Sequence, residues 1–489
     1  MTELIALPLS EPISVLDPEH AVRIGGAWRQ GSAGVFDVED PATGELVARV
    51  ADGSAADAVA AVDAASQSLP AWSALAPRAR SELLSRVREL MLRDAERLAA
   101  LIVLENGKSW ADARAEVGYA AEFFRWYAEE AVRPHGDYGQ SPAGGTRTLV
   151  THKPVGVAAL VTPWNFPAAM ATRKIAPALA AGCTVVLKPA AETPLTAIAI
   201  TRLISEAGVP DGVVNLVPST DAASIVTAWL EDPRVRKISF TGSTRVGKIL
   251  LRQAADRVVN TSMELGGNAP FVVMESADVA AAVDGALVAK FRNGGQACTA
   301  ANRFYVHAGV AEEFVARFGA AVEALRVGPA EHGSDIGPLI SAQALANVTS
   351  AVDGAVERGA VVAHRAQAPS GSGHFHPAVV LTGLPMDDPL LAEEIFGPVA
   401  PIVVWHDTEE LLAQVNDSEY GLAAYVYGEL GEALKLGEAL DAGMVGINRG
   451  VVSDPSAPFG GVKQSGIGRE GARAGLEEYL ETQYLSVAW

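Results

Sequence analysis

Apolar and polar residues alternate along this chain with two different periods, and each period predicts a different element. In the segment 78–103, "RARSELLSRVRELMLRDAERLAALIV", apolar residues recur at spacings of three and four, which is typical of an amphipathic helix. The wider stretch 55–132 is therefore predicted to be mainly helical. The segment 136–154, "GDYGQSPAGGTRTLVTHKP", breaks this pattern, and its alternating half "TRTLVTHK" is predicted to be an extended arm.

Beyond residue 155, short apolar runs alternate with helical stretches. The runs that predict strands are "VGVAALV", "CTVVLK", "VVNLV", "RKISF" and "FVVM", followed by "RFYVHAG", "PAVVL" and "APIVVW". Strands separated by helices indicate βαβ units, in which a parallel sheet is covered on both faces. The tail, "LEEYLETQYLSVAW", predicts a helix that runs into a final strand. The pattern as a whole predicts an α/β fold.

Length and charge narrow the class of protein. A chain of 489 residues predicts about two to four domains. Acidic residues outnumber basic ones by 58 to 38, so the formal net charge is −20, which opposes binding to the phosphate backbone of nucleic acids. No nucleic-acid partner is expected.

Cysteine usage and the N-terminal sequence bear on location. Two cysteines cannot build a disulfide framework, which fits a reducing compartment. No lysine or arginine precedes Arg23, so a secretory signal is not indicated. The uncharged stretch 155–172 contains "TPWNFP", which favours a strand, a polar turn and a helix start over a membrane span. We expect a cytoplasmic protein without a membrane partner.

Two glycine-containing turns are candidates for phosphate binding. "GIGREG", residues 466–471, matches the spacing G-x-G-x-x-G, but no strand precedes it and the chain ends 18 residues later, so it is predicted to be a turn. In "ISFTGSTRVGKILL" a strand ending at Phe240 runs through Gly242 and Ser243 into a helix. The free N–H groups of such a helix start attract an anion. This pattern is also compatible with an ordinary strand–helix joint.

Six segments in order resemble the aldehyde dehydrogenase superfamily. They are "TPWNFP", "FTGSTRVG", "MELGGNAP", "GGQACTAANR", "EEIFGPV" and "APFGGVKQSGIGREG". The resemblance implies a doubly wound parallel-sheet cofactor domain (1–135 and 155–265) and a related α/β catalytic domain (266–465). It also implies a β-arm for oligomerisation (136–154 and 470–489), hence a homodimer or homotetramer. The implied substrate is a small-molecule aldehyde.

The resemblance assigns the chemistry to four residues. An aldehyde releases hydride readily only after a thiolate has added to it, and Cys298 is the implied nucleophile. Asn165 and the backbone N–H of Cys298 are the implied donors to the oxyanion. Glu264 matches the general base, and Lys174 matches a lysine near the nucleophile and the cofactor. Taken alone, these residues also fit a buried thiol, a capping carboxylate and a solvated lysine.

The same resemblance implies a nicotinamide cofactor. Glu394 is matched to the carboxylate that holds the nicotinamide ribose, and Phe396 to the ring beside it. The remaining implied cofactor contacts are Trp164, Gly242, Ser243, Leu265 and Lys188. In "KPAAETP", Ala191 stands where many NAD-using members have an acid, and the glutamate is shifted to Glu192, where we expect it to point elsewhere. Without that acid Lys188 could pair with a 2′-phosphate, which favours NADP over NAD.

Within the superfamily the chain resembles the succinate-semialdehyde dehydrogenases most. Members of that group bind the far carboxylate of the substrate with two arginines and a serine, and Arg173, Arg292 and Ser453 match these positions, with Phe459 nearby. Because buried cations need an anionic partner, a carboxylated aldehyde is favoured. Glutarate semialdehyde or a broad range of aldehydes stays open, as does a purely structural role for Arg292.

The second cysteine, two histidines and two other classes of protein complete the predictions. Cys183 opens the run "CTVVLK" and is expected in the core, and His374 and His376 are expected on one strand face at the surface, so no metal site is predicted. A cysteine hydrolase or acyltransferase would pair its thiol with a histidine, and none lies near Cys298 in the sequence. An inactive binding protein on the same fold would be expected to lack one of the catalytic residues.

Overall fold

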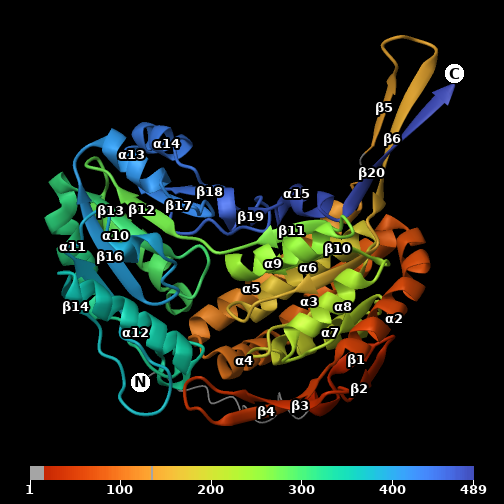
Figure 1. Ribbon diagram of the computed structural model, residues 1–489, viewed down its shortest axis with the longest axis horizontal. Helices are drawn as coiled ribbons and strands as arrows, with labels where there is room; N and C mark the ends of the chain where they lie inside the picture. Colours follow the sequence, from red (N-terminus) through yellow and green to blue (C-terminus); the bar gives the residue numbers. More distant parts are fainter. Residues whose placement is uncertain (1–15, 134–135, 489) are drawn as a thin grey trace.

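The computed structural model describes residues 16–133 and 136–488 (Figure 1). Residues 1–15 lie outside the described residues. They include the start of the predicted cofactor domain and most of the stretch before Arg23, which was expected not to be a signal peptide. Two large sheets organise the chain, one of eight strands and one of seven. Among the described residues no helix is long and apolar enough to cross a membrane.

The eight-stranded sheet has the order β19-β11-β10-β7-β8-β9-β1-β2. Its parallel centre consists of β7 (Val157–Val161), β8 (Thr184–Lys188), β9 (Val214–Leu216), β10 (Val235–Thr241) and β11 (Asn260–Glu264). Its antiparallel edges are β1 (Val22–Ile24), β2 (Ala27–Arg29) and β19 (Gly466–Ile467). Along β7, Ala158 and Leu160 pack into one core while Ala159 packs into another. The sheet is therefore covered on both faces.

The seven-stranded sheet has the order β14-β15-β16-β13-β12-β17-β18. Its strands are β12 (Ala269–Val273), β13 (Ala301–His307), β14 (Val361–Arg365), β15 (Val379–Thr382), β16 (Val399–Trp405), β17 (Ala423–Tyr427) and β18 (Met444–Ile447). All pairs are parallel except β14 with β15. Phe271 and Val272, neighbours on β12, face different cores, so this sheet too is covered on both faces.

Helices fill the stretches predicted to be helical. The helices associated with the first sheet are α2 (Ala55–Ala74), α3 (Pro77–Arg93), α4 (Ala95–Asn106), α5 (Trp110–Ala131), α6 (Pro167–Ala181), α7 (Leu195–Glu206), α8 (Ala222–Glu231) and α9 (Thr244–Ala255). Those associated with the second are α10 (Val279–Phe291), α11 (Ala308–Glu323), α12 (Ala342–Glu357), α13 (Thr408–Asn416) and α14 (Leu430–Glu438), and α15 (Ala472–Glu477) precedes the last strand. Five 3-10 turns are η1 (Pro18–His20), η2 (Arg292–Gly295), η3 (Ala330–His332), η4 (Pro389–Ala392) and η5 (Lys463–Ser465).

Local sequence explains where several helices begin. Ser54 and Asp57 form a reciprocal capping box at the start of α2, and a proline at the first position starts α3. The stretch 155–172 contains β7, a turn and the start of α6, as predicted.

A three-stranded antiparallel sheet stands away from the rest of the chain in Figure 1. It consists of β5 (Asp137–Gln140), β6 (Thr146–Pro154) and the final strand β20 (Leu480–Ala488). The extended arm predicted from "TRTLVTHK" is thus confirmed, whereas its role in oligomerisation stays a prediction. A separate hairpin joins β3 (Gly34–Glu39) and β4 (Leu46–Asp52).

Cys183 is fully buried directly before β8, which confirms its place in the core. The histidine prediction is wrong. His374 and His376 lie in the loop before β15 because the strand begins only at Val379, after Pro377. His376 is buried rather than exposed, with Nδ1 at 2.7 Å from the carbonyl oxygen of Pro377.

Candidate active site

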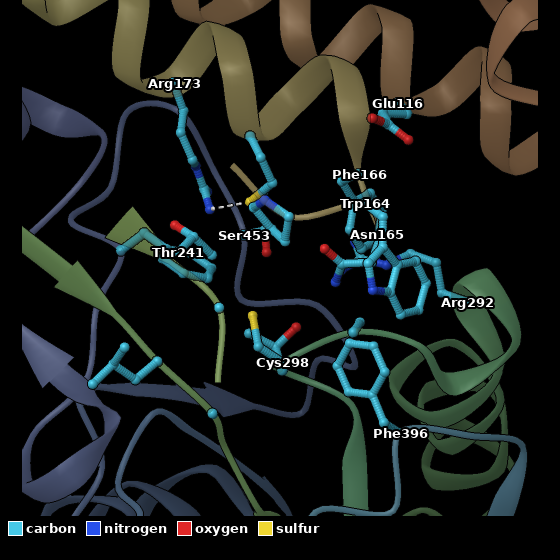
Figure 2. Close-up of a pocket in the computed structure, with 18 of the residues that line it drawn as sticks. Glu116, Trp164, Asn165, Phe166, Arg173, Thr241, Arg292, Cys298, Phe396 and Ser453 are labelled. Atoms are coloured by element: carbon cyan, nitrogen blue, oxygen red, sulfur yellow. Dashed lines mark hydrogen bonds between the residues drawn. The ribbon is translucent and has the colours of Figure 1, made fainter. Parts of the chain in front are cut away.

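A cavity of about 320 Å³ lies beside the carboxyl ends of the first sheet's parallel strands. Its wall includes residues that follow β7, β10 and β11, together with parts of α5, α6 and the turn after η2 (Figure 2). This is where open parallel sheets bind ligands, because the loops that leave the strand ends converge there. The cavity brings together residues from 112 to 459.

Cys298 follows a turn whose backbone requires glycine. Asn293, Gly294 and Gly295 all have positive φ, and a Cβ at Gly295 would lie 2.3 Å from the carbonyl oxygen of Gly397. The turn brings the Cys298 thiol to the cavity, where it is partly exposed. Burial raises the pKa of this thiol to about 12, and the carboxylates of Glu394 and Glu264 add to the rise. The thiol therefore needs a base or a nearby cation to ionise near neutral pH.

Asn165 lies in the loop between β7 and α6, on the cavity wall near Cys298 (Figure 2). Its Nδ2 donates to the carbonyl oxygen of Gln296, at 3.1 Å. An amide nitrogen carries two N–H groups, so one donor remains beyond this bond. The side chain is thus tied to the turn that carries Cys298.

Glu264 is the last residue of β11 and is buried behind the cavity wall. Burial raises its pKa well above the ordinary value, and Glu470 raises it further, whereas Lys174 and Arg173 oppose the rise. Its Oε2 has no hydrogen-bond partner among the described residues, and a Cβ at Gly460 would lie 2.9 Å from its Oε1. A carboxylate with a raised pKa and an unused oxygen is suited to accept a proton.

Lys174 lies on α6 and does not line the cavity. Its ammonium pairs with Glu470 and donates to the hydroxyl of Ser239, at 2.9 Å. Because the side chain is fully buried, the solvated-lysine reading is wrong. Glu470 belongs to "GIGREG", which the sequence marked only as a turn, and no pattern there points to a buried ion pair. The ion pair between Lys174 and Glu470 was therefore not predicted.

A second part of the cavity wall carries the predicted nicotinamide contacts Trp164, Glu394 and Phe396. The rings of Trp164 and Phe396 meet edge to face, with centroids 5.5 Å apart. Glu394 accepts a hydrogen bond from the backbone N–H of Gly267, at 3.2 Å, and burial raises its pKa to about 7. Two aromatic rings beside a carboxylate fit a heteroaromatic ring attached to a sugar.

The turn from β10 into α9 also reaches the cavity. Gly242, Ser243 and Leu265 line it, and Ser243 caps α9 by accepting a hydrogen bond from Val246 N. Leu265 packs so closely on α9 that a Cβ at Gly247 would lie 2.5 Å from it. The hydroxyl of Thr241, also in the wall, is buried and has no hydrogen-bond partner in the part of the chain that the structure describes. An open helix start beside an unpaired hydroxyl fits the phosphate part of a dinucleotide.

Lys188 and Ala191 lie outside this cavity. Lys188 ends β8 and donates to the carbonyl oxygen of Pro189, at 3.0 Å. Burial lowers its pKa, and the carboxylates of Glu192 and Asp52 oppose the fall. Glu192 is exposed and its charge acts on Lys188, so the direction of its side chain stays a prediction.

The third part of the wall is cationic. Arg173 is 2% exposed, donates to the Tyr119 hydroxyl at 2.7 Å and lies 3.3 Å from a carboxylate oxygen of Glu470. Its guanidinium stacks on Phe459, 4.0 Å from the ring centroid. Tyr119, on α5, was missed because its spacing is that of a core residue.

Arg292 and Ser453 complete this part of the wall. Among the described residues the guanidinium of Arg292 contacts the ring of Phe166 at 5.4 Å and forms no ion pair. Arg292 is therefore a cation of the cavity wall with no described carboxylate at ion-pair distance, although the carboxylate of Asp112 lines the same cavity.

A model of the aldehyde dehydrogenase family matches residues 28–485. The chain belongs to the aldehyde dehydrogenase family. It is 49% identical to a succinate-semialdehyde dehydrogenase of Paenarthrobacter nicotinovorans, over 91% of this chain and 99% of the relative. A glutarate-semialdehyde dehydrogenase of Pseudomonas aeruginosa is 44% identical, over 94% and 96% of the two chains. A solved structure described as an Escherichia coli NADP dependent enzyme is 44% identical with a TM-score of 0.95, and covers 97% of this chain and 99% of its own.

This aldehyde dehydrogenase is thus an enzyme that oxidises a small-molecule aldehyde with NADP or NAD. The predicted family and the α/β fold with parallel sheets are confirmed. The residue assignments and the domain boundaries stay predictions. Among the described residues no group of three or more metal-ligating side chains is found.

Proposed function

We propose that this aldehyde dehydrogenase oxidises an aldehyde that carries a carboxylate at its far end, succinate semialdehyde first, to the corresponding dicarboxylate. The observation that carries the proposal is the cationic wall. Arg173 is buried against Glu470, Arg292 forms no ion pair with any described residue, and Ser453 adds a hydroxyl to the same cavity. Desolvated guanidinium groups are costly unless an anion meets them. The names of the relatives at 49% and 44% identity support the same substrate class.

The first half of the reaction forms a covalent adduct on Cys298. Its thiolate adds to the carbonyl carbon, and the carbonyl oxygen becomes an oxyanion that receives the Asn165 N–H and the backbone N–H of Cys298. A bound nicotinamide supplies the acceptor for the hydride that leaves this tetrahedral carbon. The product on the enzyme is a thioester of Cys298, and one hydride has left the substrate.

The second half hydrolyses the thioester. Glu264 accepts a proton from water as the water oxygen adds to the thioester carbon, and the Cys298 thiolate departs. The carboxylate of Glu264 lies in the field of Lys174 and Arg173, which oppose the effect of burial on its pKa. Over both halves the aldehyde and water yield a carboxylate, one hydride and two protons, and a bound nicotinamide would take up the hydride.

The cofactor, the domains and the assembly complete the proposal. Ala191 offers no carboxylate to repel a 2′-phosphate, which supports NADP as the preferred cofactor. We assign the cofactor domain to 1–135 and 155–265, the catalytic domain to 266–465 and the arm to 136–154 and 470–489. The arm's exposed Tyr138 and Tyr484 support a role in a homodimer or homotetramer. Two free thiols and no disulfide among the described residues fit a cytoplasmic enzyme.

The test is an aldehyde panel with both cofactors. We expect kcat/KM for succinate semialdehyde to exceed that for butanal at least tenfold, which corresponds to about 1.4 kcal/mol. Arg292→Ala should remove most of this preference while butanal oxidation changes little. Arg317→Ala, on the exposed face of α11, is the matched control and should change neither rate.

Equal losses toward both aldehydes in Arg292→Ala would make this arginine structural. No preference in the wild-type enzyme would refute the carboxylated substrate while leaving aldehyde oxidation intact. Glutarate semialdehyde in the same panel decides the chain length.

A further inference from the structure

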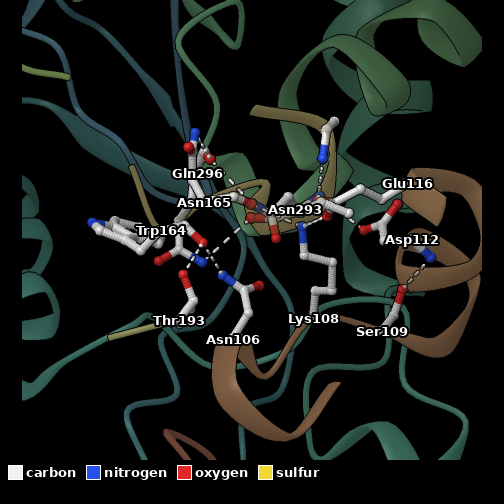
Figure 3. Close-up of polar contacts among 12 residues, drawn as sticks. Asn106, Lys108, Ser109, Asp112, Glu116, Trp164, Asn165, Thr193, Asn293 and Gln296 are labelled. Carbon is white, nitrogen blue, oxygen red and sulfur yellow. Dashed lines mark hydrogen bonds and ion pairs between the residues drawn. The ribbon is translucent and has the colours of Figure 1, made fainter. Parts of the chain in front are cut away.

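A network of buried polar groups surrounds the loop that carries Asn165 (Figure 3), and one of its members, Glu116, also lines the cavity. At its centre Lys108 and Glu116 form an ion pair, with Nζ and Oε2 2.6 Å apart and both side chains 0% exposed. Neither residue belongs to the motifs that carry the family resemblance. Replacing such a pair by apolar groups is often neutral or stabilising, so stability alone does not account for two charges here.

Lys108 contacts the backbone of the Asn165 loop. Its Nζ donates to the carbonyl oxygen of Asn165 at 2.8 Å, and it lies 4.1 Å from the centroid of the Phe166 ring. Together with Glu116 these contacts enclose the ammonium group completely. The charge-assisted bond to the Asn165 carbonyl is stronger than a bond from a neutral donor.

Glu116 fixes the other end of the same loop. Its Oε1 accepts from the backbone N–H groups of Ala168 and Ala169, at 2.8 and 3.2 Å. These N–H groups belong to the first turn of α6, whose own N-cap, Phe166, offers no side-chain acceptor. The carboxylate thus supplies the cap that the local sequence lacks, at the helix end that favours negative charge.

On its other side the loop is bound to the turn of Cys298. Asn293 Nδ2 donates to the carbonyl oxygen of Asn165 at 2.9 Å and to that of Gln296 at 3.1 Å. The Asn165 carbonyl therefore receives two donors, Lys108 and Asn293, which occupy both of its lone pairs. The side chain of Asn165 donates to Gln296 as well. The backbone and side chain of Asn165 are both fixed relative to the nucleophile's turn.

We propose that the Lys108–Glu116 pair is a positioning device, with Lys108 as a positioning residue that acts through Asn165. It holds the peptide of Asn165 so that the side-chain N–H stays aimed at the oxygen that becomes negative during the reaction. Oxyanion donors stabilise a transition state only when they are already in place, and small misplacements are costly. The inference rests on the proposed oxyanion role of Asn165.

The experiment uses a double-mutant cycle. Lys108→Met/Glu116→Gln removes both charges, leaves no unpaired buried ion, and keeps a side-chain oxygen to accept from α6. Asn165→Ala and the triple variant complete the cycle. The readouts are the single-turnover rate of NADPH formation, the Kd for NADPH and the thermal midpoint. Lys237→Met is the matched control, because Lys237 is also a fully buried lysine with polar partners but lies away from the cavity.

We expect the pair variant to form NADPH about 10- to 100-fold more slowly, below the 10²–10³-fold typical of losing an oxyanion donor outright. KM for the aldehyde and Kd for NADPH should stay within about twofold, and Lys237→Met should keep the wild-type rate. The triple variant should be within about threefold of Asn165→Ala, since the pair acts through Asn165. Asn293→Ser, which removes the second donor to the same carbonyl, should show the same non-additivity and serves if the pair variant does not fold.

The inference would be overturned if the pair substitutions slowed NADPH formation by the same factor in the Asn165→Ala background as in the wild-type enzyme. A comparable loss of rate in Lys237→Met would overturn it as well. If the pair variant forms NADPH at the wild-type rate while Asn165→Ala is slow, the inference is overturned and the oxyanion role of Asn165 stands. If Asn165→Ala itself forms NADPH at the wild-type rate, the oxyanion role and this inference both fail. If the wild-type enzyme oxidises no aldehyde, the proposed function fails and the inference with it.

Discussion

The reactivity of Cys298 toward a disulfide reagent should depend steeply on pH. Burial, then Glu394 and Glu264, raise the pKa of this thiol from 9.0 to about 12. At pH 8 the thiolate fraction is then about 10⁻⁴, against about 10⁻¹ for a thiol with the ordinary value. The logarithm of the thiolate's rate constant rises with the pKa of the thiol with a slope of about 0.4–0.5. Over three pKa units this makes each thiolate about 20-fold more reactive. The net expectation is a reaction about 50-fold slower than that of a peptide thiol at pH 8.

The assay follows dithiodipyridine release by the cofactor-free enzyme between pH 6 and 11. Cys183→Ala leaves Cys298 as the single thiol of the chain. We expect the rate to rise about tenfold per pH unit up to at least pH 10, because the thiolate is the reactive form. Glu394→Gln should increase the rate at pH 8 because it removes the largest charge effect on the thiol. A rate that levels off below about pH 9 would refute the reasoning. Poor access of the reagent to Cys298 cannot explain such a result, because it lowers the rate at every pH without moving the midpoint of the pH profile.

Two further expectations concern hydrolysis and cofactor choice. Glu264→Gln should give a burst of reduced cofactor followed by turnover slowed about 10²-fold or more, as is typical of losing a general base. Because the pKa of Glu264 is raised, wild-type turnover should increase with pH until this carboxyl ionises, and the variant should lack that increase; an identical pH profile would remove Glu264 from the mechanism. Ala191→Glu should shift the ratio of kcat/KM values from NADP toward NAD by like-charge repulsion near Lys188, measured with both cofactors at a fixed aldehyde concentration. A ratio that stays constant would contradict our interpretation of this motif.

The fold followed from the sequence where the pattern was long or strongly apolar. The helices within 55–132, the strands around Val157–Val161 and Thr184–Lys188, and the final helix and strand were all predicted. The strands at the edges were not. The three-residue β1 and β2 are too short for a period to be recognised, and β14 carries exposed and half-buried residues without a regular alternation. The buried β17, "AAYVY", lies between glycines and was not singled out.

The residues of the candidate site also divide into those that a local motif predicted and those that it did not. Cys298, Asn165 and Phe396 belong to contiguous motifs, so the sequence pointed to them, and the structure places all three on one cavity wall. Lys108 belongs to no such motif, and Glu470 lies in "APFGGVKQSGIGREG" without a role that its type and spacing could assign. Their importance arises from contacts across 57 and 296 positions of the chain, to Asn165 and Lys174 respectively, and such contacts leave no local pattern. A single sequence identifies residues by type and spacing, whereas a positioning role depends on which distant groups the fold brings together.

In the mechanism that we propose, burial and the charges of the cavity require a base to act on the Cys298 thiol. Burial raises the pKa of Cys298 most, Glu394 and Glu264 raise it further, and Arg173 and Arg292 lower it. A substrate carboxylate bound by the two arginines would offset the cations that favour the thiolate, because opposite charges at short range cancel in their effect on a third group. The anions would then dominate the field at the sulfur when the aldehyde is in place. Ionisation of Cys298 must therefore be assisted by a proton acceptor or precede substrate binding, and a carboxylate with a raised pKa, such as Glu264, is suited to accept that proton.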